Sequence, residues 1–199
     1  MTFLFDIGRV LLDFNFAPSL KTLFAADDEE SAARLGRILE RKDEFEAGLM
    51  DVPTYTDWAL DILGTETSAD EFLAAWRNIF TPNFPMWQRV RELREQGHRL
   101  ILFSNTSAAH CPWIFEEFPE FALFDDAVLS FNTGMVKPQR GIYEYAISHH
   151  SLIPAETAYI DDLEPNIRMG EHFGFICWQY DLHHHGAFDE WIDALLESK

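Results

Sequence analysis

Short apolar runs alternate with helical stretches along most of this chain, and this alternation limits the fold more than any other feature of the sequence. Five runs have the length of buried strands, at residues 2–5, 99–103, 127–129, 157–160 and 175–179, of which 127–129 is the weakest. Helical patterns separate most of them, at residues 87–96, 139–149 and 164–173, and a last one closes the chain at 187–197. Such alternation is typical of a parallel sheet covered by helices on both faces. We therefore expect an α/β fold.

The segment from about residue 16 to residue 81 breaks this alternation. Helical patterns occur around residues 17–24, 31–39, 53–63 and 69–80, and no run in the segment predicts a strand. A helical insertion after the first strand is expected to lie as a cap over the edge of the sheet. The sequence thus predicts a core of residues 1–15 and 82–199 and a helical cap of residues 16–81.

The charge of the chain restricts its partners. Fifteen Lys and Arg residues against 34 Asp and Glu residues give a formal net charge of −19. This excess of negative charge argues against nucleic acid and against an anionic membrane surface as partners. It would also repel an anionic ligand, so the site of such a ligand needs a local cation or a bound metal.

The cysteines and the N-terminal residues indicate where the chain works. Cys111 and Cys177 are too few for a disulfide framework, and they show no metal-ligand spacing. No basic segment precedes the first apolar run, and no stretch approaches the ~20 apolar residues of a membrane-spanning helix. We expect a reduced, cytoplasmic protein, and the sequence leaves its oligomeric state open.

Polar side chains follow several of the predicted strands, at the points where the strands end. Asp6 follows the first strand, and Lys137 precedes a predicted helix. The others are Ser104 and Asn105, after the run at 99–103, and Asp161 and Asp162, after the run at 157–160. Because ligands of open parallel sheets bind outside the carboxyl ends of the strands, we expect these groups to converge on one rim.

The residue types at this rim favour one chemistry. Three carboxylates would repel one another by roughly 4 kcal/mol per pair at about 4 Å and an effective dielectric near 20, and a divalent cation removes that repulsion. Oxygen ligands without His or Cys suit Mg²⁺. Lys137 supplies a positive charge for phosphate oxygens, and Ser104 and the amides near Asn105 can donate hydrogen bonds to them. Asp6 is then placed to attack phosphorus and to form an aspartyl phosphate that water hydrolyses.

These motifs resemble those of the haloacid dehalogenase superfamily of hydrolases. The matching pieces are the FDIGRVL run at residues 5–11, Ser104-Asn105-Thr106, Lys137-Pro138, and Asp161-Asp162 with Asn166 following. Further matches at residues 94–99, 134–138 and 142–143 and at His110 resemble the bacterial alpha-D-glucose-1-phosphate phosphatase group. The resemblance implies a Rossmann-like catalytic core with a small helical cap, and Mg²⁺-dependent hydrolysis of a small phosphate monoester. A sugar phosphate is the expected metabolite.

The resemblance also implies a role for each matching residue. Asp6 would be the nucleophile and a metal ligand, the Gly8 carbonyl a second metal ligand, Asp162 a direct metal ligand, and Asp161 one that acts through water. Ser104, Asn105 and Lys137 would hold the phosphate. Asn166 would orient the groups around it.

Position 8 departs from the wider superfamily. Most of its phosphatases have a second aspartate two residues after the nucleophile, which acts as general acid and base, whereas this chain has Gly8. The loss of such a group typically lowers the rate by ~10² to 10⁴. The closer relatives share this glycine, so we expect a substrate with an easy leaving group, such as an anomeric sugar phosphate, or another acid, for which His110 is a candidate.

Two alternatives remain open at this stage. A catalytically weak member of the superfamily would bind a phosphorylated ligand or a protein partner through an aromatic cap. A metal-independent 2-haloacid dehalogenase also lacks the second aspartate, but those enzymes replace the acidic pair with serines, so Asp161 and Asp162 favour a phosphatase.

The sequence does not decide what several other residues do. Phe14, Phe16, Phe45, Trp58 and Trp76 are candidates for the lining of a pocket between cap and core. Glu44 and Glu46 are expected to be exposed helix acids, and His183, His184 and His185 to be solvated.

Overall fold

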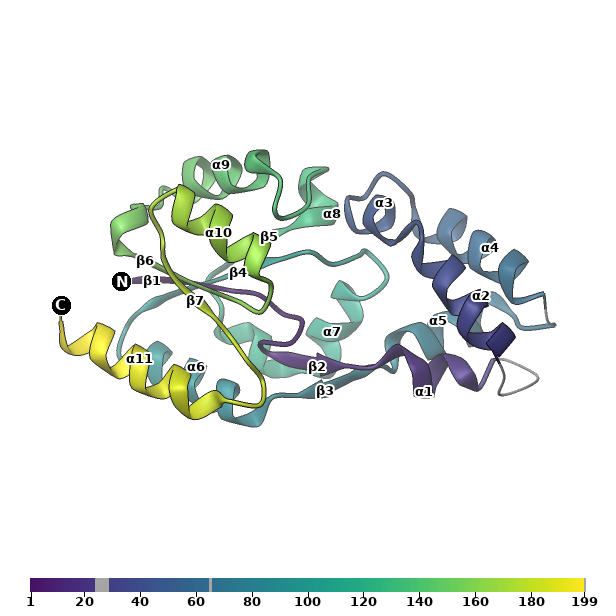
Figure 1. Cartoon of the computed structure of the whole chain (residues 1–199), viewed down its shortest axis with the longest axis horizontal. Coiled ribbons are helices and arrows are strands. Elements are labelled where there is room, and N and C mark those ends of the chain that lie inside the picture. The colour runs from purple at the N-terminus through teal and green to yellow at the C-terminus, as the bar shows by residue number, and fades with distance from the viewer. Residues whose placement is uncertain (24–28, 65, 199) are drawn as a thin grey trace.

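The computed structural model describes residues 1–23, 29–64 and 66–198. Its centre is a five-stranded sheet in the order β5-β4-β1-β6-β7, in which every neighbouring pair is parallel (Figure 1). The strands are β1 (Thr2–Phe5), β4 (Arg99–Ser104), β5 (Asp126–Leu129), β6 (Thr157–Asp161) and β7 (Ile176–Gln179). The predicted α/β fold with a Rossmann-like parallel sheet is therefore confirmed.

Helices cover both faces of this sheet, because side chains alternate between the two faces along a strand. Phe3 and Phe5 point to the face covered by α6 (Phe84–Glu95) and α11 (His185–Glu197), whose apolar residues belong to the same cluster. Leu4 points to the opposite face, which α9 (Arg140–His149) and α10 (Glu164–His172) cover. The side chains of Phe3, Leu4 and Phe5 are fully buried.

Shorter elements complete the sheet domain. These are α7 (Cys111–Glu117), the 3₁₀ helices η1 (Pro119–Leu123) and η2 (Pro154–Glu156), and α8 (Ser130–Thr133). Cys111 and Cys177 are both free cysteines in the structure. In the part of the chain that the structure describes, no helix has the length and apolar character needed to cross a membrane.

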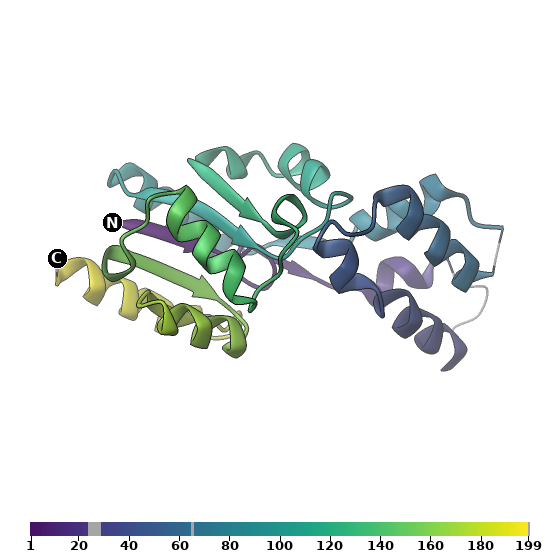
Figure 2. The ribbon, with the colours of Figure 1, turned by 90° about the horizontal axis from the view of Figure 1, so that it is seen from above.

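A helical segment, defined here as residues 16–23, 29–64 and 66–77, lies beyond the carboxyl ends of the strands (Figures 1 and 2). Its helices are α1 (Phe16–Lys21), α2 (Glu29–Leu39), α3 (Lys42–Glu46), α4 (Val52–Leu63) and α5 (Ala69–Arg77). They enclose an apolar cluster of their own that includes Phe45, Tyr55 and Trp76. Residue 24, with which the first predicted helix ends, lies outside the described residues.

An antiparallel two-stranded ribbon connects the sheet domain to the helical segment. It pairs β2 (Leu12–Phe14) with β3 (Phe80–Pro82), so that the chain leaves and re-enters the sheet domain along the same path. The expectation that residues 69–80 form one helix and that no strand occurs between residues 16 and 81 is wrong. Helix α5 ends at Arg77, and Phe80 pairs with Phe14 instead.

Candidate active site

Three carboxylates meet where β1 and β6 end. Asp6 directly follows β1, Asp161 is the last residue of β6, and Asp162 comes next. One oxygen atom from each of the three lies within 4.8 Å of the others. The parallel pairing of β1 with β6 causes this meeting, because it aligns Phe5 with Ile160 and so brings the residues that follow side by side.

Lys137 places a positive charge among these carboxylates. Its Nζ lies 2.6 Å from Asp161 Oδ2 and 3.1 Å from Asp6 Oδ1, and it also donates to the Phe103 carbonyl oxygen at 2.6 Å. The contacts with Asp161 and with the Phe103 carbonyl are hydrogen bonds, whereas the contact with Asp6 is an ion pair. The two carboxylates raise the pKa of Lys137 although burial opposes them, so the side chain stays charged.

Asn105 lines a cavity above these carboxylates, and its side chain holds Lys137 in place. Its Nδ2 donates to the Lys137 carbonyl oxygen at 2.9 Å, and its Oδ1 accepts from the Lys137 backbone N–H at 2.7 Å. The side chain thus bridges the loop after β4 to the segment that carries the lysine. Its predicted contact with phosphate stays a prediction.

Asp161 is fully buried and every oxygen of its carboxylate is engaged. Oδ2 accepts from Lys137 and, at 2.6 Å, from the Tyr159 hydroxyl. Oδ1 accepts from the Leu163 backbone N–H and from Asn166 Nδ2, both at 2.9 Å. Asn166 therefore orients this carboxylate. These bonds fix the position of the Asp161 carboxylate, which in turn holds the Lys137 ammonium group.

The Asp6 carboxylate has one oxygen without a hydrogen-bond donor. Asp6 is 8% exposed, and its Oδ1 accepts no hydrogen bond of good geometry although Lys137 is close. Burial raises the pKa of Asp6 to about 6, against the opposing effects of Lys137 and of a hydrogen bond from Ser104. Burial also raises the pKa of Asp162 to about 7, and the nearby Asp6 and Asp161 add to that effect. A buried carboxylate oxygen without a donor, beside a second carboxylate of raised pKa, fits the oxygen ligands that Mg²⁺ prefers.

A cavity of about 400 Å³ opens above this cluster. Side chains from the sheet domain that line it include Asp6, Ser104, Lys137, Asp162 and Asn166. Its opposite wall comes from the ribbon, the helical segment and the first turn of α7. A ligand in the cavity can therefore reach the carboxylates. The end of the ligand that points away from them is surrounded by the ribbon, the helical segment and α7.

His110 stands in this cavity as a neutral imidazole. Its Nε2 lies 2.9 Å from the Trp76 carbonyl oxygen, and its ring stacks on the Trp76 indole with the centroids 5.5 Å apart. Burial lowers the pKa of His110 to about 4. The ring is uncharged near pH 7 as a result, and its predicted role as an acid stays a prediction.

Position 8, where most phosphatases of the superfamily would have the second aspartate, is a glycine that lies against the Phe14 ring. A Cβ atom added at Gly8 would lie 3.0 Å from Phe14 Cε1, which is closer than ordinary van der Waals contact. Phe14 reaches this position because the chain turns between β1 and β2, where the Arg9 N–H donates to the Leu12 carbonyl oxygen at 2.8 Å. The space beside Gly8 is thus filled by the Phe14 ring.

The comparisons with known proteins agree with this arrangement. A family model described as haloacid dehalogenase-like hydrolase matches residues 1–174, most of the chain. The chain belongs to the haloacid dehalogenase-like hydrolases.

Two curated relatives of this hydrolase are phosphatases. The chain is 26% identical over 186 residues to D-ribitol-5-phosphate phosphatase of Bacteroides thetaiotaomicron, covering 88% of this chain and 89% of the relative. It is 28% identical over 180 residues to a sesquiterpene phosphatase of Aspergillus oryzae, covering 87% of this chain and 86% of the relative. The two names refer to different compounds, D-ribitol 5-phosphate in the first and a sesquiterpene in the second.

A solved structure shares the fold. A HAD family enzyme of Bacteroides thetaiotaomicron, crystallised with magnesium and inorganic phosphate, superposes with a TM-score of 0.75 at 22% identity. The superposition covers 91% of this chain and 94% of that one. The strand order and the position of the helical segment are thus those of a known haloacid dehalogenase-like architecture.

Only some of the aromatic residues that the sequence of this hydrolase suggested for the pocket lie there. Phe14 and Phe16 line the cavity, whereas Phe45, Trp58 and Trp76 do not. Phe45 instead stacks on Tyr55 inside the helical segment, with the centroids 4.1 Å apart, because both residues lie on faces that its helices turn toward one another. Trp76 supports the wall from behind through His110.

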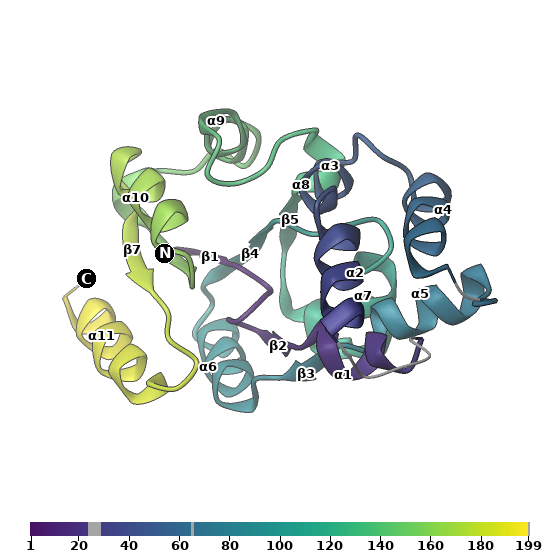
Figure 3. The same ribbon diagram turned by 45° about the vertical axis from the view of Figure 1, so that its right-hand side comes forward.

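Glu46 also corrects an expectation. Its side chain is 15% exposed and lines the cavity of this hydrolase, where Lys42 Nζ lies 2.8 Å from its Oε2. Helix α3 carries both residues and packs beside α8 (Figure 3). The Ser130 hydroxyl lies 2.5 Å from the Glu46 carbonyl oxygen and 3.0 Å from the Thr106 N–H, which donates to it. Ser130 thus ties α3 to the loop after β4.

Sequence reasoning missed Tyr159 and Ser130. A signal for Tyr159 existed, because a residue two positions before Asp161 in a strand shares its face. No local signal marked Ser130. The histidines at 183–185 take no part in the acidic cluster, which is the one metal-type grouping among the described residues. His184 instead pairs with Asp181 at 2.7 Å.

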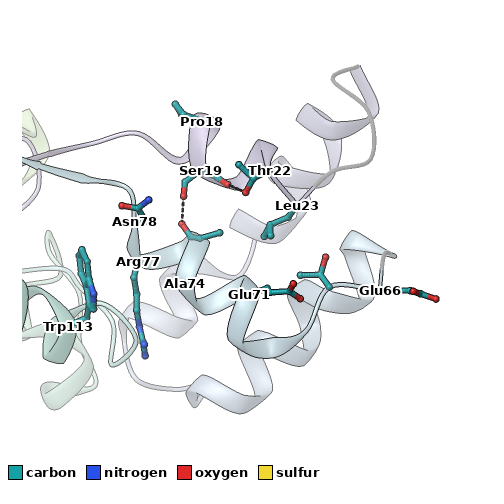
Figure 4. Close-up of a pocket in the computed structure, with 12 residues that line it drawn as sticks. Pro18, Ser19, Thr22, Leu23, Glu66, Glu71, Ala74, Arg77, Asn78 and Trp113 are labelled. Carbon is teal, nitrogen blue, oxygen red and sulfur yellow. Dashed lines mark hydrogen bonds between the residues drawn. The ribbon is translucent and has the colours of Figure 1, made fainter.

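A second and larger hollow of about 1090 Å³ lies on the far side of α5 (Figure 4). Its charged lining residues are Glu66, Glu71 and Arg77, and the Trp113 indole closes one side. Arg77 Nε donates to the Ala109 carbonyl oxygen, and Glu71 caps α5 through Ser68. Because Arg77 and Glu71 already have partners within the chain, and because Lys137 and two of the three carboxylates line the smaller cavity, we infer that the smaller cavity holds the chemistry of this hydrolase.

Proposed function

We propose that this hydrolase is a Mg²⁺-dependent phosphatase that cleaves a small phosphate monoester through an aspartyl phosphate on Asp6. The observation that carries the proposal is the Asp6 carboxylate, which has an oxygen without a hydrogen-bond donor inside a cluster of three carboxylates and a buried lysine. The phosphatase names of both curated relatives and the magnesium and phosphate in the similar solved structure support it.

Each residue of the cluster has a role in this proposal. Asp6 and Asp162, with the Gly8 carbonyl, would hold the metal directly. Asp161 would act on the metal through water. The bound ion would offset the charge of the carboxylates and of the phosphate. Lys137 keeps Asp6 ionised and lowers the repulsion of an incoming phosphate. Ser104 and the backbone amides after β4 would donate hydrogen bonds to phosphate oxygens.

The chemistry proceeds in two displacements at phosphorus. An Asp6 oxygen bonds to phosphorus while the bond to the alcohol oxygen breaks, and the alcohol leaves with a proton from solvent or from a nearby acid. Water then attacks the aspartyl phosphate, which releases inorganic phosphate and regenerates the carboxylate. Residues 16–81 act as a cap that surrounds the alcohol part. A sugar phosphate remains the substrate expected from the resemblance.

The test uses p-nitrophenyl phosphate, whose good leaving group needs no acid. We expect turnover with Mg²⁺ and its loss with a chelator. The Asp6→Asn variant should lower kcat by on the order of 10⁴ or more, because it removes the nucleophile. Asp57→Asn makes the same chemical change at an exposed position on α4 and should leave kcat unchanged.

Two outcomes would overturn the proposal. One is the absence of phosphate release from the wild-type protein with Mg²⁺, which would favour the ligand-binding alternative. The other is release of chloride from 2-chloropropionate without metal, which would identify a haloacid dehalogenase.

A further inference from the structure

The cavity has two walls of different chemistry. The wall formed by the strand ends carries the carboxylates, Lys137 and the polar groups of the loop after β4. The opposite wall is formed mostly by apolar side chains, namely Phe14, Phe16, Leu39, Ile79, Phe80 and Ile114. A phosphate held at the first wall directs its alcohol toward the second.

The apolar wall is packed from several sides. The Phe14 ring lies under the Arg9 guanidinium at 4.7 Å and edge-on to Phe16 at 5.8 Å. Phe80 meets the His110 ring edge-on at 5.0 Å. Trp76, which is 1% exposed, supports both Phe16 and His110 from behind. Such contacts fix the positions of the rings before a ligand arrives.

The polar groups of this wall have partners within the protein. Lys42 and Glu46 form an ion pair with each other at 2.8 Å, and Lys42 also lies 3.3 Å from Asp43. His110 uses Nε2 at the Trp76 carbonyl oxygen. A polyol that entered this space could bond to Lys42, Glu46 or His110, but its hydroxyl groups that faced the six apolar side chains would be buried without hydrogen-bond partners, which is unfavourable. An apolar alcohol would instead remove hydrocarbon surface from water on both sides.

We propose that the alcohol part of the substrate is apolar, a small alkyl or arylalkyl alcohol rather than a sugar or a polyol. This inference rests on the proposed phosphatase function and departs from the sugar phosphate expected from the resemblance. The cavity, at about 400 Å³, lies toward the small end of the roughly 300–1,000 Å³ range of ligand pockets. It therefore favours a small alcohol.

The experiment compares phosphate monoesters of primary alcohols, whose leaving groups are closely matched. The apolar esters are ethyl, butyl, hexyl and benzyl phosphate, and the polar esters are glycerol 3-phosphate and ribitol 5-phosphate. With Mg²⁺ present, we expect kcat/KM to rise about fourfold per methylene until the cavity is filled. Benzyl phosphate should exceed ribitol 5-phosphate by about tenfold or more. A flat alkyl series, or a preference for ribitol 5-phosphate, would overturn the inference.

The same experiment separates the two proposals. If no ester is hydrolysed, and p-nitrophenyl phosphate is not hydrolysed either, then the proposed phosphatase function fails. If the polyol esters are hydrolysed faster than the apolar ones, then the phosphatase function stands and only the apolar substrate class fails.

A matched pair of leucine variants tests the wall itself. Leu39 lines the cavity at the end of α2, whereas Leu49 is 74% exposed and does not line it. Leu39→Asn should lower the benzyl-to-ribitol ratio of kcat/KM by about tenfold, and Leu39→Met should keep the ratio. Leu49→Asn should leave the ratio unchanged. Unchanged selectivity in a folded Leu39→Asn variant, shown by its thermal unfolding, would contradict the inference.

Discussion

The two walls of the cavity are built in opposite ways. At the strand ends, Asp6, Lys137 and Asp161 are joined by short ion pairs, and each partner depends on the others. In the helical segment, Lys42 pairs with Glu46 and with Asp43, and its side chain is 38% exposed. The loss of one charged residue at the strand ends is therefore expected to destabilise the protein, because it leaves buried charges without a partner. A residue of the apolar wall can change with a smaller effect on stability.

The largest effect is expected from removing one lysine in each region. Lys137→Met leaves Asp6 and Asp161 buried without their cation, so the free energy of unfolding should fall by about 3–5 kcal/mol. Lys42→Met removes an ammonium whose side chain is 38% exposed, and the loss should stay below about 1 kcal/mol. Urea denaturation of both variants measures the difference. Equal losses would break the comparison.

The pH dependence of metal binding is expected to be an intermediate effect. The raised pKa values of Asp6, about 6, and of Asp162, about 7, mean that protons compete with Mg²⁺ for these oxygens as the pH falls. Below each pKa the carboxyl group is neutral and a poor ligand. Between pH 8 and pH 6 the affinity for Mg²⁺ should therefore fall by on the order of tenfold.

Calorimetric titration of Mg²⁺ at several pH values measures this effect. The Asp162→Asn variant should bind more weakly and should lose part of the pH dependence, because one competing proton is gone. An affinity that is the same at pH 6 and pH 8 would show that these carboxylates do not hold the ion.

The smallest effect is expected at His110, in the apolar wall. The imidazole is neutral near pH 7, and a glutamine at this position can still donate to the Trp76 carbonyl oxygen. His110→Gln should therefore lower kcat for hexyl phosphate by less than tenfold. A loss of ~10² to 10⁴ with hexyl phosphate, but not with p-nitrophenyl phosphate, would instead identify His110 as the general acid.

The sequence predicted the charged wall far better than the apolar one. Asp6 and the Asp161-Asp162 pair each follow an apolar run, and parallel pairing brings the ends of such runs together. Nothing comparable exists for the ribbon, because β2 and β3 have three residues each and show no alternation long enough to recognise. The expected helix over residues 69–80 was too long for this reason.

The position of Glu46 shows why the helical segment could not be predicted. Its place in the cavity depends on how α3 meets α8, through the Ser130 hydroxyl and through Gly48. Gly48 has a φ of +70°, and a Cβ atom there would overlap the Phe131 carbonyl oxygen. These contacts join residues more than 80 positions apart, and no periodicity of the sequence records them.

The contact between Gly8 and Phe14 links catalysis to selectivity. An acidic side chain at position 8 and the Phe14 ring would compete for the same space, since even a Cβ atom would come within 3.0 Å of the ring. A version of this enzyme that carries such an acid at position 8 would therefore need the Phe14 ring, which is part of its apolar wall, to shift. Changes at the two positions are expected to occur together, both in divergent relatives and in any redesign of the site.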